Sequence, residues 1–128
     1  MKINNKEILI NNDSQIRDIQ GKFSACYPFL KIDFLEESNA EKYSRSKLLD
    51  PRTSLKRLAT INQRKIDINT NRTVSEVSHD FQDMLGVIVQ VSRKSGNGWN
   101  AITISDSWTL QSQNIAAEYI CAEMAIPH

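Results

Sequence analysis

Three consecutive residues of the chain supply the side chains of a serine hydrolase relay. Ser78, His79 and Asp80 carry a hydroxyl, an imidazole and a carboxylate, the groups that activate a nucleophile in acyl transfer. Their spacing excludes this use, because neighbouring residues on a helix do not face each other. We interpret His79 as a solvent-exposed histidine and His128 as the end of the chain, where fraying is usual.

Metal chemistry and acid–base chemistry find no better candidates. Cys26 and Cys121 lie far apart in segments of helical pattern, without the close spacing of zinc ligands or of a redox pair. We expect both to be reduced, partly buried thiols. Glu36 and Glu37 are adjacent, which suits solvation better than the fixed separation that general acid and base roles need. The sequence predicts no catalytic residue, no metal site and no cofactor.

Residues 93–98 read Arg-Lys-Ser-Gly-Asn-Gly and combine two cations with the exposed amides of a turn. Such a turn can form a small anion site. The run lacks the order of a P-loop, since no Gly-Lys-Ser or Gly-Lys-Thr opens a helix. A plain hairpin turn is the favoured interpretation, and an enzyme acting on an anionic small molecule near this turn is an alternative.

Trp99, directly after this turn, is the best clue to function. A Trp on an open sheet face offers apolar area and an N–H donor, a combination enriched in binding hot spots. We expect Trp108 to pack at the entry to the last helix, and Gln113 or Asn114 to be a buried amide that anchors Trp99 or the hairpin. The predicted binding residues are Trp99, Arg93, Lys94, Gln90 and Thr103.

The formal net charge is +1, but the charge is unevenly distributed. Residues 42–72 hold nine Lys and Arg against two Asp, a local net charge of +7. Clustered cations steer anionic partners, although single-strand binders usually add aromatic stacking platforms that this segment lacks. A solvated connector is the favoured interpretation. The alternative is a nucleic-acid patch made of Arg52, Lys56, Arg57, Arg64 and Lys65.

Length and composition indicate one domain over residues 1–128, because 128 residues with 40% hydrophobic content can bury a real core. The first twelve residues lack the apolar stretch of a secretory signal, and no run approaches the roughly 20 apolar residues of a membrane span. We therefore expect a cytoplasmic protein without a membrane partner.

The C-terminal third resembles a family of small uncharacterised bacterial proteins with a Trp-Thr-Leu-x-x-Gln-Asn signature. The resemblance implies a bacterial cytoplasmic setting and a stable fold, and it implies no activity. Gln111 and Ser112 stand where such sequences tend to have acidic residues. The matching residues are Arg93-Lys94-Ser95-Gly96, Trp99, Thr103, Asp106, Trp108-Thr109-Leu110 and Gln113-Asn114.

One structural pattern occurs twice, over residues 7–35 and 65–92, with a basic connector over 36–64. Each copy passes from alternating apolar residues through helical spacing and back to alternation, which predicts strand, helix and strand. The residues Ile8, Ile10, Ile16, Ile19 and Phe23 recur 58 positions later as Ile66, Ile68, Val74, Val77 and Phe81.

Capping residues and helix-ending residues predict where the two helices begin and end. Asp13 or Ser14 caps the first helix, and Pro28 ends it after Tyr27. Thr73 and Glu76 have capping-box spacing at the start of the second, which ends at Gly86.

Three further elements are expected. A short helix near Arg52 has Leu55 and Leu58 inward, and a hairpin leads into an alternating segment over 99–105 with Ile102 and Ile104 facing the helices. A last helix over 110–124 has one buried stripe, made of Leu110, Ala117, Ile120, Cys121 and Met124. The pattern predicts an α+β two-layer sandwich, with helices on one face of a mixed or antiparallel sheet. Its open face should carry Lys31, Asp33, Asp67, Gln90, Ser92, Trp99 and Thr103.

We therefore expect a non-catalytic protein-binding module or small subunit that uses the open sheet face or a sheet edge. Its partner is another protein or a second copy of the chain. Nucleic-acid binding through the basic segment is the alternative from another class.

Overall fold

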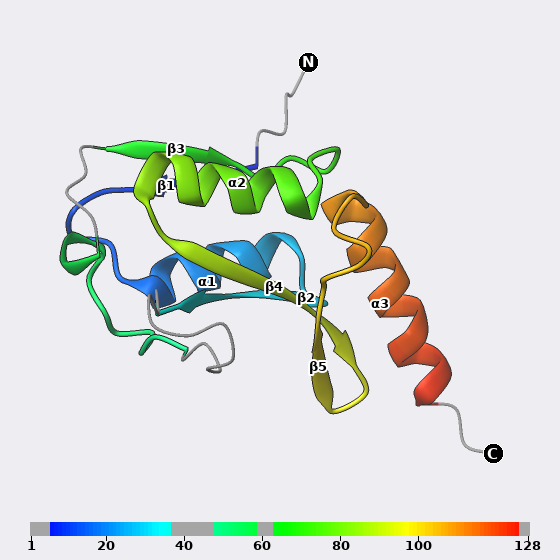
Figure 1. Cartoon of the computed structure of the whole chain (residues 1–128). Coiled ribbons are helices and arrows are strands. Elements are labelled where there is room, and N and C mark those ends of the chain that lie inside the picture. Colours follow the sequence, from blue (N-terminus) through cyan, green and yellow to red (C-terminus); the bar gives the residue numbers. More distant parts are fainter. Residues whose placement is uncertain (1–5, 37–47, 59–62, 126–128) are drawn as a thin grey trace.

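The computed structural model describes residues 6–36, 48–58 and 63–125 (Figure 1). The elements in chain order are β1 (Glu7–Ile10), α1 (Ile16–Cys26), β2 (Leu30–Leu35), the 3₁₀ turn η1 (Leu55–Arg57), β3 (Arg64–Asp67), α2 (Val74–Leu85), β4 (Ile88–Ser95), β5 (Gly98–Ala101) and α3 (Leu110–Met124).

The predicted α+β sandwich is confirmed, and all strand pairs within its sheets are antiparallel. The described strands form two sheets rather than one: β1 pairs with β3, and β2, β4 and β5 follow one another in the second sheet. Ile8 lies opposite Ile66 in the first sheet, and Ile32 lies opposite Val91 in the second. The strands of the segment β1–α1–β2 thus pair with those of the segment β3–α2–β4: β1 pairs with β3, and β2 pairs with β4.

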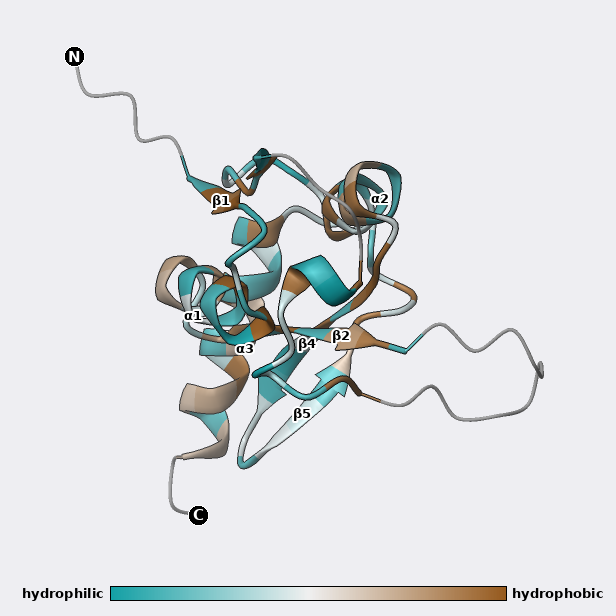
Figure 2. Cartoon of the chain, turned by 90° about the vertical axis from the view of Figure 1, so that its left-hand side faces the viewer, coloured by the Kyte–Doolittle hydropathy of each residue, from teal (hydrophilic) through white to brown (hydrophobic). Residues whose placement is uncertain are grey.

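The interior is built from the apolar faces of both segments. Figure 2 shows the hydrophobic side of α2 turned inward and its hydrophilic side turned outward. On β2 the alternate residues Leu30, Ile32 and Phe34 are buried. Phe23 and Phe81 are completely buried, as predicted for core anchors. Phe81 meets Phe34 of β2 edge to face, with ring centroids 5.6 Å apart, which joins α2 to the sheet.

The first turns of α1 and α2 make corresponding backbone hydrogen bonds. The amide of Ile16 donates to Thr53 O (3.0 Å), and 58 residues later the amide of Val74 donates to Trp108 O (3.2 Å). These recurrences are what an internal repeat would produce, and the repeat itself stays a prediction. The other corresponding pairs are Arg17 N to Pro51 O with Ser75 N to Asp106 O, and Leu55 N to Ser14 O with Leu110 N to Arg72 O.

The helix ends follow the predicted chemistry with one shift. Thr73 and Glu76 form a reciprocal capping box, and Gly86 ends α2 with φ +66°. At α1 the cap residue is Gln15 rather than Asp13 or Ser14, and its amide donates to the Asp18 carboxylate (2.9 Å). Ser14 is displaced from the cap because its hydroxyl accepts from the amide of Asn11.

The strand after the hairpin is shorter than predicted. The hairpin turns at Gly96, whose φ of +60° suits a tight two-residue connection, and α3 spans the predicted residues. However, β5 ends at Ala101, so alternation does not continue to Ser105. Ile102 still packs against the core, whereas Ile104 is 95% exposed, and its predicted inward position is wrong.

Candidate functional site

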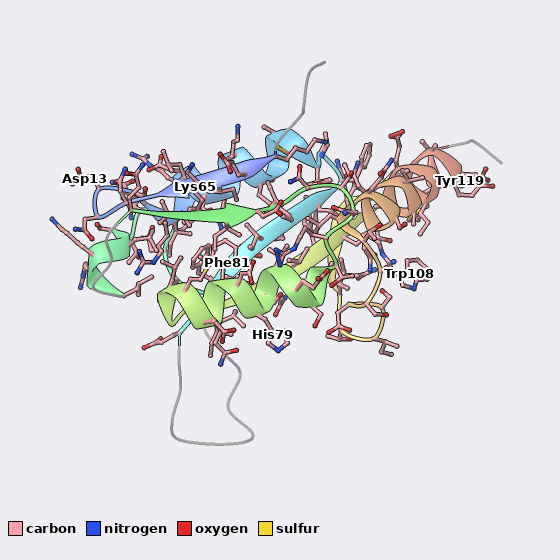
Figure 3. The ribbon with its side chains drawn as sticks, turned by 90° about the horizontal axis from the view of Figure 1, so that it is seen from above. Asp13, Lys65, His79, Phe81, Trp108 and Tyr119 are labelled. Carbon is pink, nitrogen blue, oxygen red and sulfur yellow. The ribbon has the colours of Figure 1, made fainter. Side chains whose placement is uncertain are left out.

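Ser78, His79 and Asp80, the hydrolase residue types on α2, do not contact one another as a relay would. His79 Nδ1 lies 2.8 Å from Ser75 O in its own helix, and its side chain points outward in Figure 3. Asp80 instead pairs with Arg72 at 2.8 Å. The three side chains therefore form no proton relay.

The five predicted binding residues divide between two surfaces. Trp99 lies opposite Lys94 in the pairing of β5 with β4. Side chains that lie directly opposite each other on paired strands project from the same side of a sheet. Side chains that are two positions apart on one strand also project from the same side. Trp99, Lys94 and Gln90 therefore share the outer face of the β2–β4–β5 sheet, and Arg93 projects from the other side.

Trp99 is framed by cations on this outer face. The Lys31 ammonium lies over the indole ring, 5.1 Å from its centroid, and also 3.5 Å from the Asp33 carboxylate. The Trp99 side chain is still 39% exposed. The outer face thus presents an accessible indole that is contacted by a lysine of β2, on the far side of β4.

Arg93 points toward α3 and meets Gln113. Its Nη1 lies 3.2 Å from Gln113 Oε1, and Gln113 Nε2 donates to both the carbonyl and the hydroxyl oxygen of Ser105 (2.7 and 2.9 Å). Gln113 is fully buried, so the predicted buried amide exists. It anchors Arg93 and the loop after β5, and not Trp99. Asn114 accepts from the amide of Phe29 (2.9 Å), just before β2.

A cavity of about 360 Å³ opens beside Arg93. It brings together Arg93 and Thr103, the two predicted residues that are absent from the outer face, with Trp108. Trp108 is half exposed and lies beside the loop that leads into α3 (Figure 3), whereas the sequence predicted that it would pack there. The backbone of Trp108 is fixed, because its carbonyl accepts a hydrogen bond from the amide of Val74, but its indole remains half exposed.

The outer side of α3 is a surface that sequence reasoning missed. Ile115 and Tyr119, four residues apart, are 57% and 66% exposed, and Met124 near the end of the helix is also exposed. The prediction placed Ile120 and Met124 on the buried stripe, but both are exposed, and the described fully buried residues of α3 are Leu110, Gln113 and Ala117. The sequence did contain a signal for this surface, because the apolar residues Ile115 and Tyr119 recur at helical spacing outside the predicted buried stripe.

The glycine-rich turn faces the end of α3. A cavity of about 340 Å³ lies there, lined by Lys94, Gly96, Asn97, Cys121 and Met124 among others. The Cys121 thiol lies 3.7 Å from the Lys94 carbonyl, and a Cβ on Gly96 would meet the Met124 methyl at 2.8 Å. The turn is therefore packed against an apolar helix end, which does not favour an anionic substrate.

The basic segment is only partly described, since residues 42–47 and 59–62 lie outside the described ranges. Arg52 pairs with Asp50 at 3.0 Å, and the hydrogen bond from Arg52 lowers the pKa of the Asp50 carboxyl. Lys56 and Arg57 are exposed on η1, and Arg64 and Lys65 are exposed on β3. Figure 1 places η1 and the beginning of β3 at the same end of the molecule, so four cations remain there for an anionic partner.

One buried tyrosine has a strongly shifted pKa. Tyr27 is 2% exposed, and its hydroxyl donates to Ile68 O at 2.5 Å. Burial, assisted by Cys26 and Asp67, raises its pKa to about 12. Because Tyr27 lies in the core with its proton engaged, this shift reflects packing.

Within the described ranges, no three or more His, Cys, Asp and Glu side chains gather as metal ligands would. No described helix combines the length and the apolar character that crossing a membrane requires. Comparisons of the chain with protein-family models, curated proteins and solved structures found no match. The resemblance of the C-terminal third to a bacterial family stays a prediction.

Proposed function

We propose that this chain is a non-catalytic protein-binding module whose partner docks on the outer face of the β2–β4–β5 sheet, with Trp99 at the centre. The observation that carries the proposal is the position of Trp99, an accessible indole on an open sheet face with Lys31 against its ring. Trp side chains supply a large part of the binding energy at many interfaces.

The neighbours of Trp99 indicate the chemistry of the partner. Lys94 lies directly opposite Trp99 in the sheet, and none of the ion pairs found among the described residues involves it. Lys31 is shared between the Trp99 ring and Asp33. A partner segment that places an apolar side chain on Trp99 and a carboxylate beside Lys94 matches this face.

The sheet also offers one edge for pairing. Ile102 N donates to Val91 O, so the alternation of antiparallel pairs turns the backbone groups of Trp99 and Ala101 away from β4. The opposite edge, β2, is already hydrogen-bonded in the described structure. The Gln20 side chain donates to Ile32 O (2.9 Å), and the amide of Leu49 donates to Phe34 O (2.8 Å). An extended partner segment can add to β5 and reach Trp99 at the same time.

The test is a pull-down of the tagged full chain from lysate of its source organism, with co-eluting protein and nucleic acid both quantified. Trp99→Ala should lose the protein partner. Met84→Ala is the control, since it removes a similarly exposed apolar side chain (42%) from α2 and should retain the partner.

Two results would contradict the proposal. A partner kept by Trp99→Ala but lost on Ile115→Ser with Tyr119→Ser would move the interface to the outer side of α3. Nucleic acid retained by wild type and Trp99→Ala alike, and released as salt rises from about 50 to 200 mM, would move the function to the basic segment.

A further inference from the structure

The cavity beside Arg93 has the composition of a small ligand site. Its volume of about 360 Å³ lies near the lower end of the usual range for small-molecule sites. Arg93, its only cation among the described residues, projects from the side of β4 opposite Trp99, and the cavity borders the proposed docking surface only at Ala101 of β5. The lining includes Arg93, Ile102, Thr103, Ile104, Ser105 and Trp108.

Arg93 is held in place by a fixed amide. A backbone carbonyl can only accept hydrogen bonds, so the Gln113 group that faces Ser105 O must be the NH₂. The Gln113 oxygen therefore faces Arg93 and accepts from its Nη1. Since Gln113 is completely buried, Arg93 is oriented before any ligand arrives.

The charge of Arg93 is not neutralised in the described structure. Among the described residues no carboxylate lies within ion-pair distance of its guanidinium, and its one side-chain hydrogen bond goes to the neutral Gln113. A guanidinium has five N–H donors in a planar fork that fits a carboxylate. A half-buried arginine with a neutral partner and spare donors is suited to binding an anion.

The rest of the cavity selects among anions. Among the described residues, Arg93 is the only cation of the lining, which favours a singly charged group over a phosphate dianion. Ile102 and the Trp108 indole supply apolar and aromatic surface, and the Thr103 hydroxyl supplies a further polar contact point. These features fit a carboxylate attached to a compact apolar or aromatic body.

We propose that this cavity binds a small apolar monocarboxylate, with Arg93 pairing to the carboxylate and Trp108 covering the apolar body. The inference goes beyond protein binding and does not depend on it. The same chemistry occurs in free carboxylic acids and at the C-terminus of a peptide that ends in an apolar residue, and the test separates these two sources.

The experiment follows the indole N–H signals of the full-length protein by NMR during titration up to about 10 mM, the range in which weak millimolar complexes are visible. The probes are phenylacetate, its neutral amide, inorganic phosphate, and a tripeptide ending in Phe with a free or an amidated C-terminus. We expect phenylacetate or the free-ended peptide to shift the Trp108 signal, and the two amides to leave it unchanged.

Variants assign the site. Arg93→Gln should weaken binding by about tenfold or more, because it removes a charged hydrogen-bond donor. Lys94→Gln removes the same charge one residue away on the opposite sheet face and should change the affinity by less than about twofold. If Arg93→Gln does not fold, Arg93→Lys serves instead, since it keeps the charge but loses the planar fork of donors and should also weaken binding, while the Trp108 signal still reports it.

A response to phenylacetate supports the free acid as the source, and a response to the free-ended peptide alone supports a peptide terminus. The proposal is overturned if no probe gives a saturable shift, if an amide binds as well as its acid, if phosphate binds more tightly than either carboxylate, or if Lys94→Gln weakens binding as much as Arg93→Gln.

Discussion

Lys31 of β2 lies over the indole ring of Trp99 of β5, two strands that do not pair directly and are bridged by β4. This contact spans the width of the sheet on its outer face. It links the residue proposed to bind a partner to β2, whose other face carries the buried Leu30, Ile32 and Phe34.

The Lys31–Trp99 contact should be measurable as a modest coupling energy. A double-mutant cycle with Lys31→Met and Trp99→Leu in urea melts should give about 0.5–1 kcal/mol, the usual size of a cation–π contact at a solvent-exposed site. Pairing Lys31→Met with Trp108→Leu is the control and should give no coupling. Zero coupling in the first cycle would mean that Lys31 does not support the indole, and that Trp99 is not held ready for a partner.

Phe23 and Phe81 should be of similar importance to stability. Both are completely buried, so Phe23→Ala and Phe81→Ala should each lower the free energy of unfolding by about 3–5 kcal/mol in denaturant melts. Phe29→Ala is the matched control, since Phe29 is only partly buried and should cost clearly less. A cost below about 1 kcal/mol at either core site would refute the interpretation of the two segments as a repeat with equivalent anchors.

The residues that cap and end the helices account for the part of the fold that could be predicted from the sequence. Pro28, Gly86 and the pair Thr73 with Glu76 act through backbone groups within a few residues, so the helix ends could be placed to within about two residues. Strand pairing depends on contacts between distant segments. The division of the strands into two sheets was therefore not predictable from alternation alone.

The candidate sites were harder to predict for a related reason. The sequence grouped Arg93 with Trp99 because they are close along the chain, but strand alternation and the hairpin register place them on opposite faces. Thr103 was assigned by continuing the alternation past Ala101, where β5 ends. Trp108 was predicted to pack, but only its backbone is engaged in the bonds found at the start of α2.

Two glycines should respond in opposite ways to the same substitution. Gly86 ends α2 with φ +66°, a conformation that disfavours a Cβ, so Gly86→Ala should lower the free energy of unfolding by about 1 kcal/mol. Gly21 lies inside α1, where an added Cβ would have open space within 4 Å, so Gly21→Ala should raise it by about 0.5–1 kcal/mol.

The measurement is a pair of urea melts against wild type. Because both variants add one methyl group, the difference in sign isolates the backbone conformation. If Gly86→Ala were neutral, or if Gly21→Ala were destabilising, the helix boundaries described for α1 and α2 would be wrong at these positions.

Tyr27 should make the protein less stable at alkaline pH. Its pKa is about 12 in the folded chain against 10.0 as the ordinary value, because burial disfavours the phenolate. Between these two values the unfolded chain releases the proton first, so it binds fewer protons than the folded chain. The free energy of unfolding therefore falls as pH rises from about 10 to 12, by on the order of 2 kcal/mol, and Tyr27 contributes no pH dependence below that window.

Tyr27→Phe separates this effect from other groups that titrate at high pH. The variant leaves the Ile68 carbonyl without its hydroxyl donor, so it should start about 1–2 kcal/mol less stable than wild type at neutral pH. Its melts should then fall less steeply than those of wild type between pH 10 and 12, and the two curves should converge. Parallel curves across that window would show that Tyr27 loses its proton equally easily in the folded and unfolded chain, contrary to its burial against Ile68.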